Sequence, residues 1–249
     1  YGVLFVFGFL TWAAAGATIP VPGLLIGAVA LSTPLIFGAM GGVISERVGV
    51  INITIEGQLL SGAFVSAVVA SVTGSTYVAL LAALIAGALT ALLLAMFSIK
   101  YFVNQVIVGV VLNVLIVGFT SFLYSVVLTK NSETLNSPPR FGRIDIPVLS
   151  QIPVIGPVLF QQTLIVYLMY IAVALVWFGL FRSKWGLRLR AVGEHPQAAD
   201  TVGINVVRTR FWNVCLAGAI AGLGGAYFTL GSVGSFGTPN LCPVSSSPS

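Results

Sequence analysis

Five long blocks of this sequence contain no charged residue, and this limits the fold more than any other feature. They are residues 1–45, 57–99, 101–129, 146–181 and 211–249. A helix needs roughly 20 consecutive apolar residues to cross the hydrocarbon core of a bilayer, so each block can hold one or two spans. The mean hydropathy of +1.05 argues against the alternative, a soluble protein with a large core. The sequence therefore predicts an all-α, polytopic helical membrane protein.

We expect about seven transmembrane helices, all within one membrane domain that covers residues 1–249. Their approximate bounds are Tyr1–Ala17, Gly23–Ile44, Ile51–Val72, Thr76–Phe97, Val103–Leu128, Phe160–Phe181 and Phe211–Gly231. Turn-forming residues separate them, most clearly in a Pro-rich stretch from Asn131 to Pro157. The chain begins inside an apolar segment without a Met or a recognisable signal peptide, so we expect it to be a fragment.

The basic residues orient these spans. Segment 182–210 contains six Lys and Arg residues against two acidic ones: Arg182, Lys184, Arg188, Arg190, Arg208 and Arg210 against Glu194 and Asp200. Because positive residues stay on the cytoplasmic side, we expect segment 182–210 inside the cell and segment 129–159 outside. The net charge of +5 therefore reflects topology and not nucleic-acid binding.

The stretch ISERVGVINITIEGQ, residues 44–58, concentrates polar side chains between two apolar blocks. In a span beginning near Ile51, Asn52 and Glu56 share one helix face, with Glu56 about 8 Å along the helix. A carboxylate at the bilayer centre costs about 2.5–3.5 kcal/mol, so this face must avoid lipid. Two interpretations of Asn52, Glu56 and Gln58 stay open: a structural hydrogen-bond cluster, or the lining or gate of a permeation route.

A second polar cluster lies in the fifth predicted span. Gln105, Gly109 and Asn113 follow one another at four-residue spacing and form a stripe on a helix. Amides can bind a neutral, hydroxyl-rich solute. They can also join helices, with about 0.6–2 kcal/mol each. We favour the joining role for any single amide, while Gln105 and Asn113 together also suit a route. Small residues four apart, such as Gly218 and Gly222, predict close helix packing.

A short helix is predicted within the basic segment, in the stretch WGLRLRAVGEHPQAADTVGIN. Pro196 suits the first position of a helix. Gly203 suits the left-handed residue just past its end. The helix between them, Pro196–Val202, is too short to be stable alone and needs a docking partner. An ordinary connecting loop is the alternative.

Several chemistries are excluded by the sequence. There is no Gly-Lys pair, which a Walker A loop requires. His195 is the only histidine, which excludes a His-rich metal site and a His-based triad. Glu56 is the only acidic residue within the predicted spans, which leaves little for a carboxylate proton relay.

Three stretches resemble a known family. GGVISERVGVINITIEGQLLSGAF, NQVIVGVVLN and GLRLRAVGEHPQAADTVGINV are similar, in this order, to motifs of permease subunits of bacterial ABC importers for nucleosides and simple sugars. This is the branch served by basic-membrane-lipoprotein-type binding proteins. The likeness covers the chain from Pro34 to about Ser235. Family members continue past GSVGSF into further membrane helices, whereas this chain runs into GTPNLCPVSSSPS, so we expect a truncation or a reading-frame change there.

The resemblance implies a multi-pass subunit of the plasma membrane that is not itself an enzyme. It implies a second permease subunit, in a homo- or heterodimer, two cytoplasmic ABC ATPase subunits and an extracytoplasmic lipoprotein that binds the solute. Membrane lipid surrounds the chain and no nucleic acid is involved. ATP and Mg belong to the ATPase, and this chain binds no cofactor.

The same resemblance implies roles for particular residues. The third motif becomes the ATPase-coupling loop, with Gly186, Arg190, Gly193, Glu194, Pro196, Ala198, Ala199 and Gly203 as its contact residues. Asn52, Glu56, Gln58, Gln105 and Asn113 become the candidates for the solute route or its gate. Nucleosides are the first expected cargo and ribose-like sugars the second. An ion-coupled secondary transporter and a purely structural membrane protein are the alternatives.

Overall fold

The computed structural model describes residues 21–128, 139, 141–145 and 160–233. Six helices in this part of the chain are long and apolar enough to cross a membrane. They are α2 (Val21–Arg47), α3 (Ile55–Thr73), α4 (Thr76–Ala95), α5 (Gln105–Leu123), α8 (Leu164–Arg182) and α11 (Val206–Ala226). Single π-helical segments extend three of them: η1 (Met96–Lys100), η2 (Tyr124–Leu128) and η4 (Tyr227–Val233). A polytopic helical membrane protein is thus confirmed, and the first predicted span lies outside the described residues.

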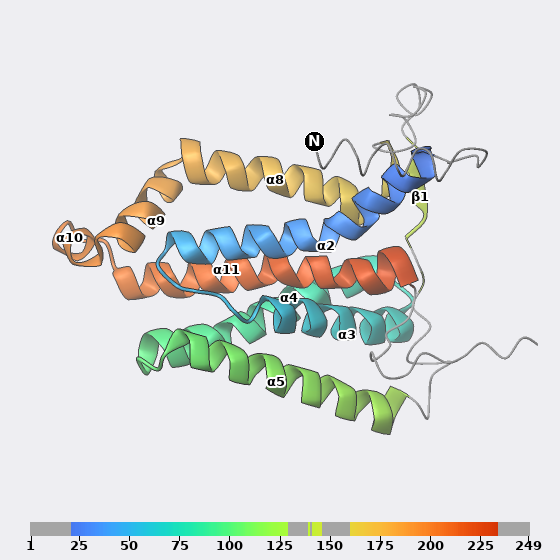
Figure 1. Cartoon of the computed structure of the whole chain (residues 1–249), viewed down its shortest axis with the longest axis horizontal. Coiled ribbons are helices and arrows are strands. Elements are labelled where there is room, and N and C mark those ends of the chain that lie inside the picture. The colour runs from blue at the N-terminus through green and yellow to red at the C-terminus, as the bar shows by residue number, and fades with distance from the viewer. Residues whose placement is uncertain (1–20, 129–138, 140, 146–159, 234–249) are drawn as a thin grey trace, which may run out of the picture.

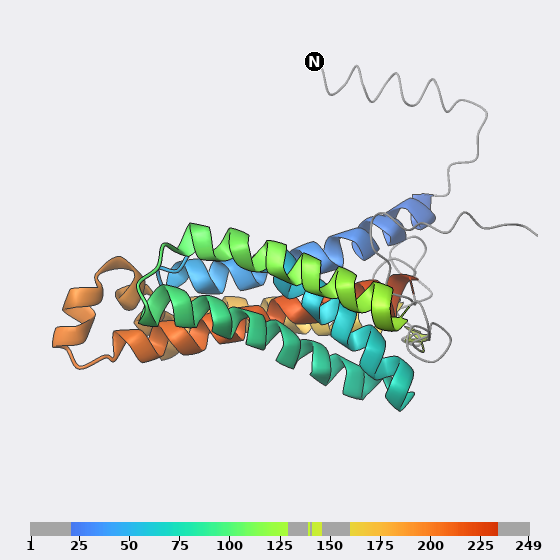
Figure 2. The ribbon, with the colours of Figure 1, turned by 90° about the horizontal axis from the view of Figure 1, so that it is seen from below.

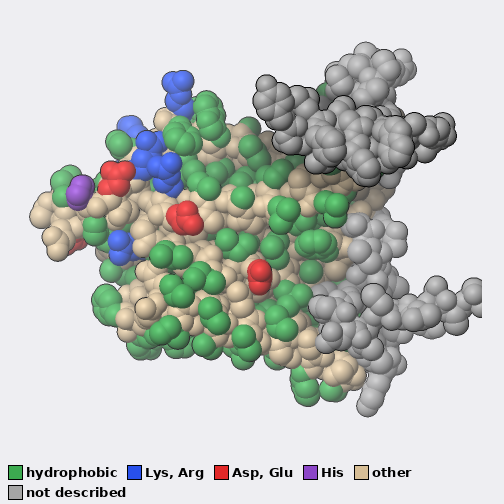
Figure 3. Space-filling model, in the orientation of Figure 1, with side chains coloured by type: hydrophobic (Ala, Val, Ile, Leu, Met, Phe, Trp, Pro, Cys, Tyr) green, Lys and Arg blue, Asp and Glu red, His purple; other side chains and the backbone are tan. Residues whose placement is uncertain are grey.

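The long helices lie roughly along one axis, and two shorter helices extend beyond one end of the bundle (Figures 1 and 2). These are α9 (Lys184–Glu194) and α10 (Pro196–Thr201). We call this end the basic end, because eight Lys and Arg residues lie on the helix ends and connections there: Arg47, Lys100, Arg182, Lys184, Arg188, Arg190, Arg208 and Arg210. Figure 3 shows the basic side chains of the visible face gathered there, while hydrophobic side chains are spread over the rest of the described face among other side chains and backbone.

The opposite end carries a small sheet that the sequence did not predict. Strand β1 (Arg143–Asp145) pairs antiparallel with β2 (Gln161–Thr163), and Ile144 lies opposite Gln162. The sixth predicted span therefore begins as a strand at Gln161, and its helix α8 begins only at Leu164.

Helix α11 lies at the centre of the bundle and packs against α2, α3 and α4. Glycines make this close approach possible. A Cβ added to Gly87 on α4 would overlap the backbone of Gly218 and lie 2.8 Å from the Cα of Gly222. A Cβ on Gly62 of α3 would also meet the Gly222 backbone. Three helices thus meet at small residues, as the spacing of Gly218 and Gly222 predicts. Within a membrane no hydrophobic effect draws helices together, so close packing at small residues contributes to their association.

The third predicted span is wrong at its start. Residues 48–54 are not helical, and α3 begins at Ile55 instead of near Ile51. Asn52 and Glu56 therefore do not share a helix face, and Glu56 lies in the first turn of α3 and not 8 Å along it. The physical reason is local. Val48, Val50, Ile51, Ile53, Thr54 and Ile55 are β-branched, and such side chains lose χ1 freedom in a helix.

A glycine pair tests the packing around α11. Gly87→Ala places a methyl group against backbone that cannot move aside, and such overpacking costs about 1–3 kcal/mol. Gly118→Ala, on α5, meets nothing within 4 Å and should gain up to about 1 kcal/mol of helix propensity. We expect the midpoint of thermal unfolding in detergent to fall for Gly87→Ala and to stay or rise for Gly118→Ala. Equal midpoints for the two variants would contradict this packing.

Candidate solute route and coupling surface

The connection between α2 and α3 runs back along the bundle, so that α3 begins partway along its length (Figure 1). The connection starts with a turn in which the amides of Val48 and Val50 both donate to the Ser45 carbonyl, at 3.2 and 3.0 Å. Gly49 closes it at φ +77°, a conformation that favours glycine. We call residues 48–54 the re-entrant segment. Between this turn and Thr54, whose carbonyl accepts from the Gln58 amide, the backbone is not helical. Within a membrane, such backbone groups must find partners inside the protein.

Two side-chain amides of α5 supply partners for Ile51 and Ile53 in this segment and for Gly57 in the first turn of α3. Gln105 Oε1 accepts from the Ile51 amide at 2.8 Å. Asn113 Oδ1 accepts from the Gly57 amide, and its Nδ2 donates to the Ile53 carbonyl, both at 2.9 Å. Gly109 lies between Gln105 and Asn113 on α5. A Cβ added to it would lie 2.9 Å from the Ile53 Cβ, so the absence of a side chain here leaves room for the re-entrant segment. The stripe of Gln105, Gly109 and Asn113 is confirmed as a stripe, and it holds the segment's backbone over a rise of about 12 Å.

Asn52 and Gln58 bind each other. Asn52 Nδ2 donates to Gln58 Oε1 at 3.1 Å, and Gln58 Nε2 donates to Asn52 Oδ1 at 3.2 Å. Asn52 Oδ1 also accepts from the Thr54 amide at 3.2 Å. Both side chains are buried, and this reciprocal pair joins the segment to the first turn of α3. Buried polar groups paired in this way rigidify a structure.

Glu56 differs from these four amides, because its side chain is exposed on this chain. It precedes Gly57, whose amide binds Asn113 of α5. Glu56 therefore lies beside α5, about 12 Å from the start of that helix at Gln105. Its place in the first turn of α3 is favourable, since a carboxylate complements the positive end of the helix dipole. The roles of all five residues in a solute route stay a prediction.

The basic segment folds into two helices, and the sequence predicted only the second. Ser183 begins α9, and its Oγ accepts from the Gly186 amide at 3.2 Å. The missed signal was this capping serine, followed by apolar residues at helical spacing, of which Leu189 and Val192 are fully buried. Asn104 and Asn205 begin α5 and α11 in the same way, each accepting an amide hydrogen bond of 2.9 Å.

The short helix α10 is confirmed, with Pro196 in its first turn and Gly203 at φ +86° beyond its end. The coupling residues divide by position. Gly186, Arg190 and Gly193 pack on this chain's own helices, and Arg190 donates to the Leu180 carbonyl at 2.6 Å. Ala199 is buried, whereas Glu194, Ala198 and Gly203 are exposed and Pro196 is half-buried. The outer face of α10 is therefore the one that carries Ala198.

Arg210 connects the coupling helices to the re-entrant segment, and the sequence analysis gave it no such role. Its Nε donates to the Val48 carbonyl at 3.0 Å and its Nη2 to the Val192 carbonyl at 3.4 Å. Val192 lies in the last turn of α9, where a cation is favourable. Next to it, a Cβ on Gly193 would overlap the Arg47 carbonyl, so α9 touches the end of α2 directly. Residues 47–49 are therefore in contact with α9, directly through Gly193 and indirectly through Arg210.

A groove of about 640 Å³ opens beside this connection, between η1, the start of α5 and the start of α11. Ser98, Asn104, Gln105 and Arg210 are polar residues in its lining. The Ser98 hydroxyl is buried and has no hydrogen-bond partner within the described part of the chain. The re-entrant segment, through Val50 and Ile51, forms one wall.

Comparison with known proteins gives the family. Residues 24–239 match the family described as "Branched-chain amino acid transport system / permease component". The chain belongs to this permease family. It is a multi-pass protein of the plasma membrane, and the resemblance drawn from its three motifs is confirmed.

Three relatives show which permease proteins this chain is similar to. The nucleoside ABC transporter permease protein NupC of Lactococcus lactis is 39% identical over 84% of this chain and 68% of the relative. The guanosine ABC transporter permease protein NupQ of Bacillus subtilis is 40% identical over 79% of this chain and 64% of the relative. The putative glucose ABC transporter permease protein TsgC13 of Haloferax volcanii is 36% identical over 84% and 63%. The chain thus spans about two thirds of their length. No solved structure matches it.

Asn113 offers the sharpest test of the re-entrant segment. Asn113→Leu leaves the Ile53 carbonyl and the Gly57 amide without partners, at about 1–3 kcal/mol for each buried group. We expect hydrogen exchange of the amides from Ile51 to Gly57 to accelerate and the unfolding midpoint to fall. Val114→Leu, at the exposed neighbouring position, is the control and should change neither. Unchanged exchange at Gly57 in Asn113→Leu would show that the amide does not hold the segment.

Proposed function

We propose that this chain is the membrane-spanning subunit of an ABC importer that moves a small polar solute, with nucleosides as the first choice of cargo. The names of NupC and NupQ, at 39% and 40% identity, support nucleosides. The glucose permease relative at 36% identity keeps simple sugars as the second choice. Its partners are two cytoplasmic ATPase subunits, a second permease subunit and an extracytoplasmic solute-binding lipoprotein. ATP and Mg bind to the ATPase subunits.

The basic end faces the cytoplasm in this proposal. It gathers every Lys and Arg of the described residues except Arg143, and positive residues stay on the cytoplasmic side. Segment 182–210 is then cytoplasmic, and segment 129–159 is extracytoplasmic. The outer face of α10 is available to an ATPase subunit, and the small sheet of β1 and β2 lies on the side from which a binding protein delivers the solute.

One observation supports the proposed transport mechanism: the re-entrant segment is hydrogen-bonded through Arg210 to α9 at one end and through Asn113 to α5 at the other. Closure of the ATPase subunits moves α10 and α9. Arg210 and the contact of Gly193 with Arg47 pass this movement to residues 47–49. The segment shifts along α5 and changes the position of Glu56 at the start of α3. Solute passage is thereby linked to ATP hydrolysis in another chain.

Glu56 indicates where the route lies. An ionised carboxylate facing lipid would be costly, and this one is exposed on the isolated chain. Its face is therefore covered by water or by the second permease subunit, whose shared boundary forms the route. An ion-coupled transporter is the weaker alternative, because Glu56 by itself gives no carboxylate relay and the relatives are ABC permeases.

Substitutions of Glu56 test the route. Glu56→Gln keeps shape and hydrogen bonding, whereas Glu56→Leu removes both. In vesicles with the complete importer, we expect Glu56→Leu to reduce guanosine uptake by about tenfold or more, and Glu56→Gln to keep part of it. Co-purification of the ATPase should be normal for both, which separates the route from assembly. Guanosine uptake at the unsubstituted level in Glu56→Leu would place the route elsewhere, and competition by ribose but not by nucleosides would make sugars the cargo.

The outer face of α10 tests the coupling role. Ala198 is exposed, so Ala198→Trp adds bulk to the docking face without disturbing this chain's interior. We expect it to insert normally and to lose co-purification of the ATPase, while Ala198→Ser, which stays small, keeps it. Ala199 does not suit this test, because it is buried and a larger residue there would disrupt the packing of α10 itself. Retained assembly and retained ATP hydrolysis in Ala198→Trp would remove α10 from the interface.

A further inference from the structure

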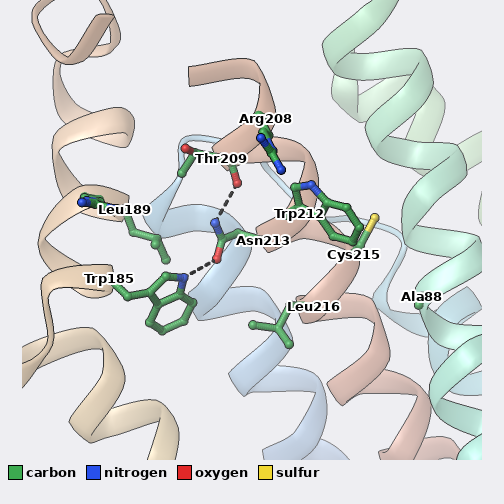
Figure 4. A pocket seen from close by; sticks show the side chains of 10 residues that line it. Ala88, Trp185, Leu189, Arg208, Thr209, Trp212, Asn213, Cys215 and Leu216 are labelled. Carbon is green, nitrogen blue, oxygen red and sulfur yellow. Dashed lines mark hydrogen bonds between the residues drawn. The ribbon is translucent and has the colours of Figure 1, made fainter. Parts of the chain in front are cut away.

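A second groove, of about 590 Å³, lies on the bundle surface at the basic end and has no part in the proposed route. Its walls come from α4, α9 and α11 (Figure 4). The residues that matter here are Ala88 on α4, Trp185 and Arg188 on α9, and Arg208, Trp212 and Leu216 on α11. None of the described residues that line the groove is acidic.

The chemistry of the groove changes with depth along α11. Arg208, Trp212 and Leu216 lie at four-residue spacing on one face, starting two residues after the helix begins at Val206. Figure 4 shows this order, with Arg208 at the mouth, Trp212 below it and Leu216 further along. Trp212 is 64% exposed and Leu216 43% exposed. A cation, an indole and an aliphatic side chain in this order match the headgroup, interface and acyl layers of a bilayer leaflet.

The facing wall repeats the pattern and is held rigidly. Trp185 Nε1 donates to Asn213 Oδ1 at 3.0 Å, and Asn213 Nδ2 donates to the Thr209 carbonyl at 2.7 Å. These bonds, drawn in Figure 4, fix the indole of α9 against α11. Arg188 lies one turn further along α9 on the same wall. Neither Arg188 nor Arg208 forms a salt bridge or a side-chain hydrogen bond with the rest of the described chain.

We propose that this groove binds one anionic phospholipid of the cytoplasmic leaflet. Its phosphate and headgroup charge lie between Arg188 and Arg208, and an acyl chain runs over Trp212 and Leu216. Ala88 leaves space for that chain, and Ile85, exposed three residues earlier on α4, continues the apolar surface. A free phosphate would use the two guanidinium groups and leave the apolar part of the groove bare. Basic pockets between membrane helices on the cytoplasmic side suit anionic headgroups.

Such a lipid would regulate the proposed transport. The groove lies between α9 and α11, the same two helices that Arg210 connects. A bound lipid bridges them and steadies α9, so ATPase coupling should depend on anionic lipid. This inference rests on the proposed cytoplasmic orientation of the basic end. Binding itself can be measured without ATPase or solute, which keeps a failure of the site distinct from a failure of the proposed function.

The two groove tryptophans serve as reporters. In a background with Trp12→Phe and Trp177→Phe, the chain is placed in phosphatidylcholine vesicles that contain either brominated phosphatidylglycerol or brominated phosphatidylcholine at equal mole fraction. We expect the brominated anionic lipid to quench the fluorescence more strongly. The double variant Arg188→Gln, Arg208→Gln should weaken the apparent affinity for phosphatidylglycerol by about tenfold and remove the preference.

The control removes the same charge outside the groove, with Arg182→Gln and Lys184→Gln, both exposed at the basic end. Preference kept in this control and lost in the groove variant supports the site. Equal loss in both would mean diffuse attraction of the basic end, and equal quenching by both lipids in the unsubstituted chain would mean no site. If inorganic phosphate displaces phosphatidylglycerol but chloride of equal ionic strength does not, the groove is a site for free anions. If the ATPase displaces phosphatidylglycerol, the groove is a protein interface. Each of these four results overturns the proposal.

Discussion

The need to satisfy backbone hydrogen bonds inside a bilayer governs this structure. Helices meet that need by themselves, but residues 48–54 leave the helix, and their partners must come from elsewhere. Asn113 meets one carbonyl and one amide with its single side chain, and Gln105 meets a second amide. An amide is suited to this work because it carries a donor and an acceptor. The polarity of Gln105 and Asn113 in an otherwise apolar helix follows from this one departure from helical structure.

The same departure connects the two parts of the molecule to which the proposed function assigns ATPase coupling and solute passage. At one end of the re-entrant segment, Val48 binds Arg210, which also binds the last turn of α9. At the other end, Ile53 and Gly57 bind Asn113, beside Glu56. A continuous helix could pass a displacement along its axis only as a rigid rod. An extended segment held by side-chain amides can slide or change partners, while α11 stays fixed by its glycine contacts with α3 and α4.

Much of this arrangement was predictable, because much of it depends on local chemistry. Apolar length indicated the spans, Pro196 and Gly203 marked α10, and small residues four apart marked the approach of α11 to its neighbours. The start of α3 was not predictable from hydropathy. The apolar stretch VGVINITI is compatible with a strand, a helix or an irregular segment, and hydropathy does not distinguish between them. Its β-branched composition was the available signal. The pairing of Asn52 with Gln58, the bridge made by Arg210 and the pairing of β1 with β2 depend on tertiary contacts, and no local pattern indicates them.

The hydrogen bonds of the re-entrant segment also set an order of events during synthesis. The α5 side chains that bind the backbone of Ile51, Gly57 and Ile53 lie 54, 56 and 60 positions further along the chain. At about 5–20 residues per second, Gln105 and Asn113 are made about 3–12 s after the segment itself. The turn at Ser45, the bond from the Thr54 amide to Asn52 and the Asn52–Gln58 pair join residues at most six positions apart and can form at once. Until α5 is made, the Ile51 amide and the Ile53 carbonyl lack the partners that they have in the finished protein, so this part of the chain can reach its final structure only after α5 joins it.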